Sequence, residues 1–356
     1  LCFDGSRHYR EFVKRELFDF DARGLLQDQW GMPDEGSLQY ALFDLELMHL
    51  AKLAAQRSGD SEFYSFLSEK VNRLDSLVSM CSHGGDIPRI GDNDSAKVFG
   101  LYSCDQRQSF FSHAAPDDID DSKEPDNLAH LDKCPHFGSL DFNWGRVAVA
   151  NFPVGKGGLG GHNHNDNGQL LLWFRQLPVL VDSGQYCYLK DLIARNLNRS
   201  TASHNVAYPA GTEMVDFDKS LAGVFTLKSQ CSSILDKKGD YIFFKYFGSY
   251  VWERELISKN DVLTVFDKIS NNSSDSISTF IFDPQWIVFS QSSNSLILKN
   301  QCKSSDLIEF KFRSAGGIEL QINRCYVHKS FYSKEKTNRV DVRFVAHLET
   351  QIRINI

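Results

Sequence analysis

The sequence predicts an α+β chain with more than one domain, in which a helical part precedes a large antiparallel β-sandwich. The chain has 356 residues, more than one typical hydrophobic core organises. Apolar residues recur at spacings of three and four before about residue 97, and short runs of β-branched and aromatic residues follow. We therefore expect a helical domain over residues 1–97 and a sandwich over residues 98–356.

Two amphipathic helices are expected in the helical part. The first covers residues 36–57, with apolar positions at Leu38, Leu42, Leu45 and Met48. The second covers residues 62–80, with apolar positions at Phe63, Leu67, Val71, Leu74 and Val78. Ser58, Gly59 and Asp60 form a natural break between them. Residues 8–20 predict a third helix.

The expected strands are short and rich in β-branched or aromatic residues. They cover residues 146–150, 169–174, 241–247, 262–266 and 278–282. Turn-forming residues at 237–240 and 271–274 separate them, as in an antiparallel sandwich. The acidic stretch 117–133 contains Pro125 and little periodicity, which predicts an exposed connection.

Composition and charge exclude several classes of protein. Lys and Arg number 39 against 46 Asp and Glu, for a net charge of -7, so a protein that coats nucleic acid through a basic field is not expected. No apolar run approaches the length of a membrane span. The eight cysteines stand singly without a C-x-x-C pair, which argues against a zinc ribbon or a disulfide scaffold. The oligomeric state cannot be read from the sequence.

Three residues predict a site for a divalent cation. His164, Asp182 and His204 supply two imidazoles and a carboxylate, a donor set that zinc accepts with one position left for another ligand. His162 lies two positions before His164, so on an extended backbone both side chains project from one face. One histidine can then hold a metal while the other faces a substrate.

Two other interpretations of these histidines compete. They can be hydrogen-bonded groups of a buried polar seam, and the spacing alone supports this interpretation about as well as a metal site. His164-x-Asp166 with the distant His204 also imitates the two-histidine, one-carboxylate triad of non-haem iron oxygenases. The oxygenase is less favoured, because residues 213–215 are Glu-Met-Val where an oxoacid-binding arginine is expected.

Three sequence blocks resemble the heparinase II/III polysaccharide lyases. They are G-H-x-H-x-D at residues 161–166, L-V-D-x-G-x-Y-x-Y at 180–188 and R-S-T-x-x-H-N at 199–205. Residues 138–152 and 252–267 are similar to the strands around these blocks in the family. Glu35-x-Ser37-x-x-Tyr40 and residues 87–94 are similar to segments near the end of its helical toroid. The likeness covers most of the chain and is strong over 138–211.

The resemblance implies an architecture and a reaction. It implies a partial α/α toroid packed on the sandwich, with an anionic polysaccharide bound in the groove between them. These enzymes cleave uronic-acid polysaccharides by β-elimination, which removes the C5 proton and breaks the bond to the 4-oxygen. It also implies a periplasmic or secreted protein.

The resemblance also assigns roles to residues. It places one zinc ion, or another divalent cation, on His164, Asp182 and His204. It makes His162 the catalytic base, and an acid and a supporting phenol are expected at Tyr40 and Tyr188, since imidazole and phenol suit the two proton transfers. Contacts with the substrate are expected from Arg199, Asn205 and Tyr186. Tyr186 is also the alternative to Tyr188 as the supporting phenol.

The chain departs from the family pattern in its helical part. The toroid normally spans several hundred residues, whereas about three helices are expected here. Residues 30–34 read Trp-Gly-Met-Pro-Asp where the family tends to show Asp-Gly, and Ala41 stands where a histidine is frequent. The alternative function is therefore a polysaccharide-binding or assembly protein that keeps the metal site and performs little elimination.

Overall fold

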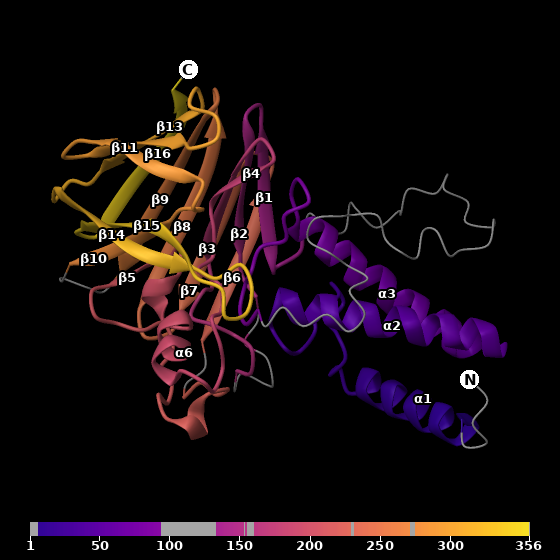
Figure 1. The fold of residues 1–356 in the computed structure, drawn as a ribbon. Coiled ribbons are helices and arrows are strands. Elements are labelled where there is room, and N and C mark those ends of the chain that lie inside the picture. Colours follow the sequence, from indigo (N-terminus) through magenta and orange to yellow (C-terminus); the bar gives the residue numbers. More distant parts are fainter. Residues whose placement is uncertain are drawn as a thin grey trace.

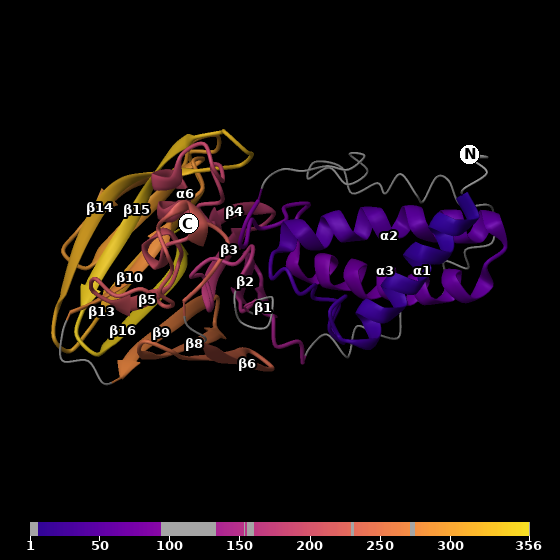
Figure 2. The same cartoon turned by 90° about the horizontal axis from the view of Figure 1, so that it is seen from below.

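The computed structural model describes residues 6–93, 133–152, 154, 160–228, 231–270 and 275–355. Figure 1 shows long helices beside a body of antiparallel strands, and Figure 2 shows the same two parts from below. A helical part followed by a β-sandwich is thus confirmed. The expected boundary at residues 97/98 and most of the expected connection at 117–133 lie outside the described residues. Within these ranges, no helix is long and apolar enough to cross a bilayer.

The three long helices occupy the predicted positions. They are α1 (Ser6–Ala22), α2 (Leu38–Ser58) and α3 (Ser61–Cys81). Ser37 caps α2 by accepting a hydrogen bond from the Tyr40 amide at 3.5 Å. Gly59 ends that helix at φ 72°, a conformation that costs glycine little. Asp60 then caps α3 through the Phe63 amide at 3.1 Å, so the predicted break is a tight turn between two caps.

The rest of the described chain is mainly β-structure. The strands are β1 (Phe137–Phe142), β2 (Gly145–Ala150), β3 (Gln169–Phe174), β4 (Leu177–Leu180), β5 (Ala207–Pro209), β6 (Ser232–Lys238), β7 (Tyr241–Phe247), β8 (Val251–Lys259), β9 (Val262–Ser270), β10 (Ser276–Ile281), β11 (Trp286–Gln291), β12 (Ser295–Asn300), β13 (Leu307–Arg313), β14 (Ile318–Val327), β15 (Glu335–Phe344) and β16 (His347–Asn355). Short helical segments are α6 (Leu192–Asn198), η2 (Thr201–Ser203) and η3 (Leu221–Gly223). The five predicted strands correspond to β2, β3, β7, β9 and β10.

The strands form three antiparallel sheets. One four-stranded sheet has the order β1-β2-β3-β4, and another has the order β14-β15-β10-β5. The eight-stranded sheet has the order β11-β12-β13-β16-β9-β8-β7-β6. Apolar residues from all three sheets share one core, as expected for sheets packed face to face.

Strand β3 lies at the centre of the molecule, and all six of its residues are buried. Leu170 and Leu172 face the core of the sandwich, whereas Leu171 and Trp173 pack with the apolar residues of α2 and α3. Because alternate residues of a strand point to opposite faces, the sheet β1–β4 is a middle layer between helices and sandwich. The loops at its ends therefore lie where the two parts meet.

Candidate active site

The three predicted metal ligands come together in the structure. His164 lies in the loop between β2 and β3, Asp182 follows β4, and His204 follows η2. One donor atom from each side chain lies within 4.8 Å of the others, and all three residues are buried. Among the residues that the structure describes, no other set of three histidines, cysteines and carboxylates meets this condition.

In each histidine of this cluster, one ring nitrogen faces a carboxylate and the other has no hydrogen-bond partner among the described residues. His164 Nε2 lies 2.8 Å from Asp92 Oδ1, and His204 Nδ1 lies 2.8 Å from Asp182 Oδ2. Their other nitrogens, His164 Nδ1 and His204 Nε2, have no hydrogen-bond partner in the described structure. A carboxylate behind one nitrogen is the usual arrangement of a metal-binding histidine. A fully satisfied polar seam would not leave both atoms without partners.

The charges of His164 and Asp182 also suit a cation. Burial lowers the pKa of His164 to about 4, so its imidazole is neutral, the form that binds a metal. Burial would raise the pKa of Asp182, but His204 outweighs it and the pKa is lowered, so the carboxylate is ionised. Burial would lower the pKa of His204, but the carboxylate of Asp182 raises it, so this imidazole would lose its proton when it binds a metal. Asp182 Oδ1 also accepts the Gly184 amide at 2.6 Å. The residues present therefore fit a divalent ion.

The iron-oxygenase interpretation is less well supported. The carboxylate that joins the two histidines is Asp182 and not Asp166. Asp166 instead accepts the Gly91 amide at 3.0 Å through Oδ2, and burial raises its pKa to about 7. The metal-binding set is thus the predicted His164, Asp182 and His204, two imidazoles and a carboxylate that suit a divalent cation.

His162 occupies a more open position than His164. Its side chain is 15% exposed, against 0% for that of His164, so it is the histidine of this pair that a substrate can reach. Its Nδ1 lies 2.9 Å from Asp92 Oδ2, and its Nε2 lies 3.4 Å from Glu35 Oε2. Asp92 therefore faces one nitrogen of each histidine.

Two tyrosines from distant parts of the chain meet at His162. The Tyr40 ring, in the first turn of α2, stacks on the imidazole with centroids 3.8 Å apart and planes at 17°. Its hydroxyl lies 3.2 Å from that of Tyr188, whose ring centroid is 6.2 Å from that of His162. Tyr186 instead packs against His328, with centroids 5.3 Å apart. The structure thus brings Tyr40 and Tyr188 to His162, whereas Tyr186 packs against His328.

Asp92 is the residue of this site that sequence reasoning did not single out. It is fully buried, and the Arg195 guanidinium donates to both of its oxygens. Burial would raise the pKa of Asp92, but Arg195 and the two histidines hold it well below its usual range. Its only signal in the sequence was its place in the segment 87–94, which resembles the family.

The backbone around Asp92 is fixed against the histidine loop. The Asp92 amide donates to His162 O at 2.8 Å, and Asp92 O accepts the Ser37 hydroxyl at 2.7 Å. Gly91 has φ 71°, and a Cβ there would lie 2.7 Å from His162 O. A side chain at position 91 would therefore push the two segments apart.

Arg199 and Asn205 do not reach the open side of the site. Arg199 is 2% exposed, and its guanidinium donates to the backbone carbonyls of Asp218, Gly223 and Val224. The Asn205 amide donates to Leu170 O and Val181 O, both at 2.9 Å. In contrast to the sequence expectation of substrate contacts, both residues hold backbone segments, because their donors are used by buried carbonyls.

A buried ion pair supports the metal cluster from the large sheet. Arg254 on β8 binds Asp267 on β9 through two hydrogen bonds of 2.8 and 3.0 Å. Its Nη1 also donates to Gly168 O at 2.9 Å and to Asn205 O at 2.7 Å. Gly168 ends the loop that carries His164, and Asn205 follows His204. Arg254 therefore ties together the two loops that carry the metal-binding histidines.

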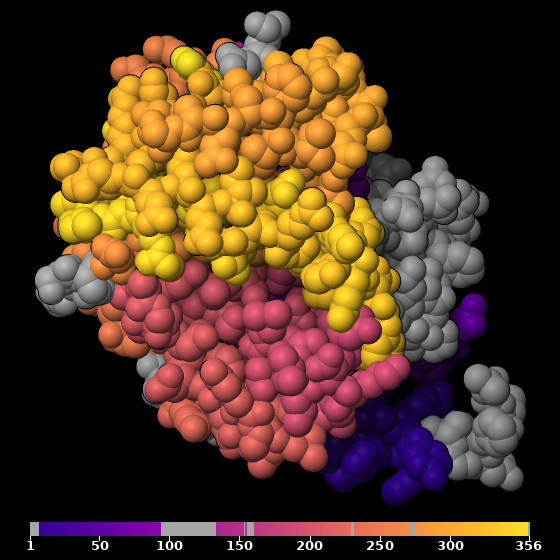
Figure 3. Space-filling view, turned by 60° about the vertical axis from the view of Figure 1, so that its left-hand side comes forward, coloured from indigo at the N-terminus to yellow at the C-terminus, as the bar shows by residue number. Residues whose placement is uncertain are grey.

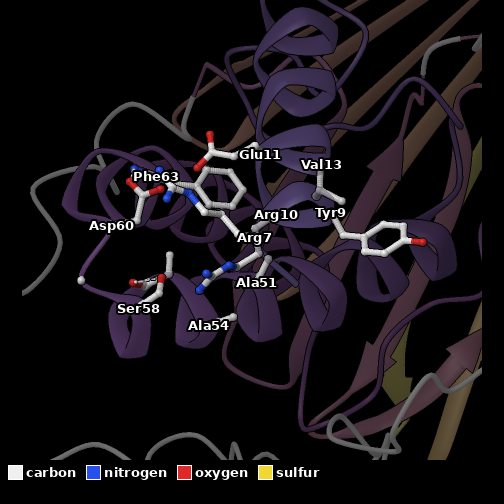
Figure 4. A pocket seen from close by; sticks show the side chains of 12 residues that line it. Arg7, Tyr9, Arg10, Glu11, Val13, Ala51, Ala54, Ser58, Asp60 and Phe63 are labelled. Carbon is white, nitrogen blue, oxygen red and sulfur yellow. Dashed lines mark hydrogen bonds between the residues drawn. The ribbon is translucent and has the colours of Figure 1, made fainter. Parts of the chain in front are cut away.

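A separate pocket of about 370 Å³ lies in the helical part. It is lined by residues of α1 and by the facing ends of α2 and α3, including Tyr9, Val13, Ala51 and Phe63 (Figure 4). No residue of the metal cluster or of the tyrosine pair lines it.

Comparison with known families identifies the family of this chain. The model of the heparinase II/III-like C-terminal domain matches residues 140–355. The chain belongs to the heparinase II/III-like family. This confirms the resemblance identified from the sequence, and the match includes all three metal-cluster residues and His162.

Solved structures of family members share the fold. The heparan sulfate lyase HepC from Pedobacter heparinus superposes with a TM-score of 0.70 at 15% identity, over 99% of this chain and 57% of that one. A structure of heparinase III superposes with a TM-score of 0.74 at 13% identity, over 97% and 56%. The chain thus spans slightly more than half the length of these proteins. No curated protein matches the sequence.

Proposed function

We propose that this heparinase II/III-like protein is a polysaccharide lyase that cleaves a uronic-acid polymer by β-elimination. One observation carries the proposal: an accessible imidazole, His162, lies between an ionised carboxylate and a pair of phenols. In the reaction, the base takes the C5 proton of the uronate, a double bond forms between C4 and C5, and the C4–O4 bond breaks. The leaving 4-oxygen then takes a proton from an acid.

His162 is the proposed base, and Asp92 is the residue that orients it. The ionised Asp92 faces Nδ1 at 2.9 Å, which favours the tautomer with hydrogen on Nδ1 and leaves the Nε2 lone pair to accept a proton, on the side where Glu35 Oε2 lies 3.4 Å away. Nε2 then accepts the C5 proton. A positioned general base of this kind typically contributes about a hundred- to ten-thousandfold in rate.

Tyr40 is the proposed acid, with Tyr188 as its hydrogen-bond partner. Stacking against His162 places the Tyr40 phenol beside the base, as expected if both proton transfers occur on one sugar. The 3.2 Å separation of the two hydroxyls lets Tyr188 donate to the Tyr40 oxygen as its proton leaves.

His164, Asp182 and His204 are the proposed ligands of one zinc ion. Bound there, the ion would supply positive charge beside the uronate. The three residues also join the loops after β2, β4 and η2, so their shared ligand would fix the loop that carries His162.

The proposal extends to the rest of the protein. We propose that the helices before residue 97 belong to a partial α/α toroid, and that residues 98–356 form the sandwich domain. The substrate groove would lie where the two meet, and a periplasmic or secreted location suits a polysaccharide substrate.

Absorbance of the unsaturated uronate tests the function. The protein is supplied with zinc and offered a panel of uronate polymers, and growth of near-ultraviolet absorbance is expected with at least one of them. His162→Ala should abolish the signal, and His347→Ala, at an exposed position on β16, should not. Polymer binding without any absorbance change would instead identify a binding or assembly protein.

A further inference from the structure

The loop between β14 and β15 lies directly against the segment that follows Asp182. The His328 amide donates to Ser183 O at 2.8 Å, and the Tyr332 amide donates to Tyr186 O at 2.9 Å. Figure 3 shows the yellow C-terminal strands in contact with the magenta and rose segment that carries α6. Residues 328–334 are therefore fixed to the same segment that supplies Asp182 and Tyr188.

Tyr332 holds a backbone conformation that is unusual for a large residue. Its φ is 62°, in the left-handed region that bulky side chains rarely adopt. Such a conformation is unfavourable and persists only where the surroundings impose it. Here the Tyr332 amide is held by its hydrogen bond to Tyr186 O, and Tyr332 is 51% exposed. Residues held in this way often belong to ligand-binding surfaces.

Two lysines lie over the tyrosine rings of this region. Lys334 Nζ is 3.9 Å from the Tyr186 ring centroid, and Lys190 Nζ is 4.9 Å from that of Tyr332. The rings themselves meet edge to face at 5.8 Å. We call these four residues the lysine–tyrosine patch. The cation–π contacts restrict where each ammonium lies, which reduces the entropy lost when it binds an anion.

The two ammonium groups of the patch are available to a ligand. Both lysines are exposed, and among the described residues neither forms a salt bridge with a carboxylate. The neighbouring Lys329 differs, since its Nζ lies 2.9 Å from Glu335 Oε2. In a chain of net charge -7, a pair of exposed lysines beside a candidate active site indicates attraction of an anion.

The patch is continuous with the residues around His162. Phe331, next to Tyr332, lies 5.3 Å from Tyr188 between ring centroids. Tyr188 in turn reaches both His162 and Tyr40. A chain of sugars bound at His162 can therefore extend over Phe331 onto the patch.

We propose that Lys190 and Lys334 form a subsite for a negatively charged group, a sulfate or a carboxylate, on a sugar that neighbours the one at His162. This subsite rests on the proposed function for the position of the polymer, but it requires only binding. Phe331 and Tyr332 supply the apolar and aromatic surface on which the intervening sugar lies, and the two ammonium groups receive its anionic substituent.

Binding of long polymers to an inactive background tests the subsite without depending on catalysis. Lys190→Gln and Lys334→Gln are combined in His162→Ala protein, and affinity is measured for a sulfated uronate polymer, its desulfated counterpart and a polymer with carboxylates alone. The double variant should bind about 3–10-fold more weakly, the sum of two partly exposed ion pairs, and its affinity should depend less on salt. Lys238→Gln, at an exposed position on β6, is the matched control and should bind like its parent.

The three polymers distinguish the source of the anion. A loss confined to the sulfated polymer assigns the subsite to sulfate, and a loss with all three assigns it to carboxylate. Equal affinity of the double variant and its parent for every polymer would overturn the proposal. An equal loss for Lys238→Gln, or no binding of the parent to any polymer, would overturn it as well. Absence of lyase activity in the unsubstituted protein would affect only the proposed function.

Discussion

The rings of Tyr40 and His162 lie face to face, 3.8 Å apart and within 17° of parallel. Tyr40 belongs to the helical part, in the first turn of α2, whereas His162 belongs to a loop of the sandwich. The pair therefore exists only when α2 is packed on the sheet β1–β4. Two groups suited to opposite proton transfers are thus placed together by the contact between helices and sandwich.

Tyr40→Phe tests the acid directly. The substitution keeps the stacked ring and removes the hydroxyl, so we expect turnover to fall by about a hundred- to ten-thousandfold with little change in polymer binding. Tyr188→Phe should cost less, because it removes only the partner hydroxyl at 3.2 Å. Initial rates of absorbance increase provide the measurement, with Tyr241→Phe on β7 as the control. Unchanged turnover in Tyr40→Phe would remove Tyr40 from the mechanism.

Asp92→Asn tests the carboxylate between the two histidines. It leaves the buried Arg195 without its counter-charge, so we expect a loss of unfolding free energy on the order of 3 kcal/mol. Turnover should fall more than folding explains, since His162 loses the group that fixes its tautomer. Denaturant unfolding and rates on the folded fraction are compared with Asp141→Asn. That control breaks the pair with Arg146, in which Asp141 is 61% exposed, and should cost about 0–1 kcal/mol.

The number of metal ions bound per chain tests the metal cluster. The protein should bind one zinc ion per chain, and His164→Ala, Asp182→Ala and His204→Ala should each abolish it. Elemental analysis after dialysis measures the content, and His328→Ala, a buried histidine outside the cluster, serves as control. Zinc at a hundred times its Kd should raise the unfolding free energy by about 2.7 kcal/mol. Full zinc content in all three variants would place the metal elsewhere.

Arg254→Met tests whether the hydrogen bonds of Arg254 link the large sheet to the metal cluster. Arg254→Met leaves Asp267 buried without its counter-charge and the carbonyls of Gly168 and Asn205 without a donor. We expect a loss of about 3–5 kcal/mol in unfolding free energy. Zinc affinity of the folded protein should also fall, which a purely structural role would not produce. Arg353→Gln removes an exposed ion pair with Glu309 and should change neither quantity much; an unaltered zinc affinity in Arg254→Met would contradict the link.

Much of the site could be predicted because its residue types occur in compact blocks. His162 and His164 are two positions apart, and Asp182 and His204 lie in the two later blocks that resemble the family. The helices α2 and α3 were predictable from the sequence, since their apolar residues recur at spacings of three and four and Gly59 separates them. Tyr40 was found because it belongs to a block that resembles the family.

The remaining residues depend on contacts between distant segments. Asp92 is 70 positions from His162, and its own neighbours carry no pattern that indicates a buried ion pair. Arg195 and Arg199 are both buried, so local sequence gave no means to tell which one reaches Asp92 and which one binds the carbonyls near η3. Lys190 and Lys334 belong to one patch only because β14 and β15 bring residues 328–334 to the segment after Asp182, and the sequence does not show this contact.

The chemistry of the cleaved polymer tests the central proposal most directly. A uronate polymer is incubated with the zinc-loaded protein in water enriched in heavy oxygen, and the fragments are weighed by mass spectrometry. We predict fragments with an unsaturated uronate end, one water lighter than hydrolysis products and free of solvent oxygen, and none from His162→Ala. Fragments that carry heavy oxygen, or equal cleavage by His162→Ala, would contradict β-elimination by this histidine.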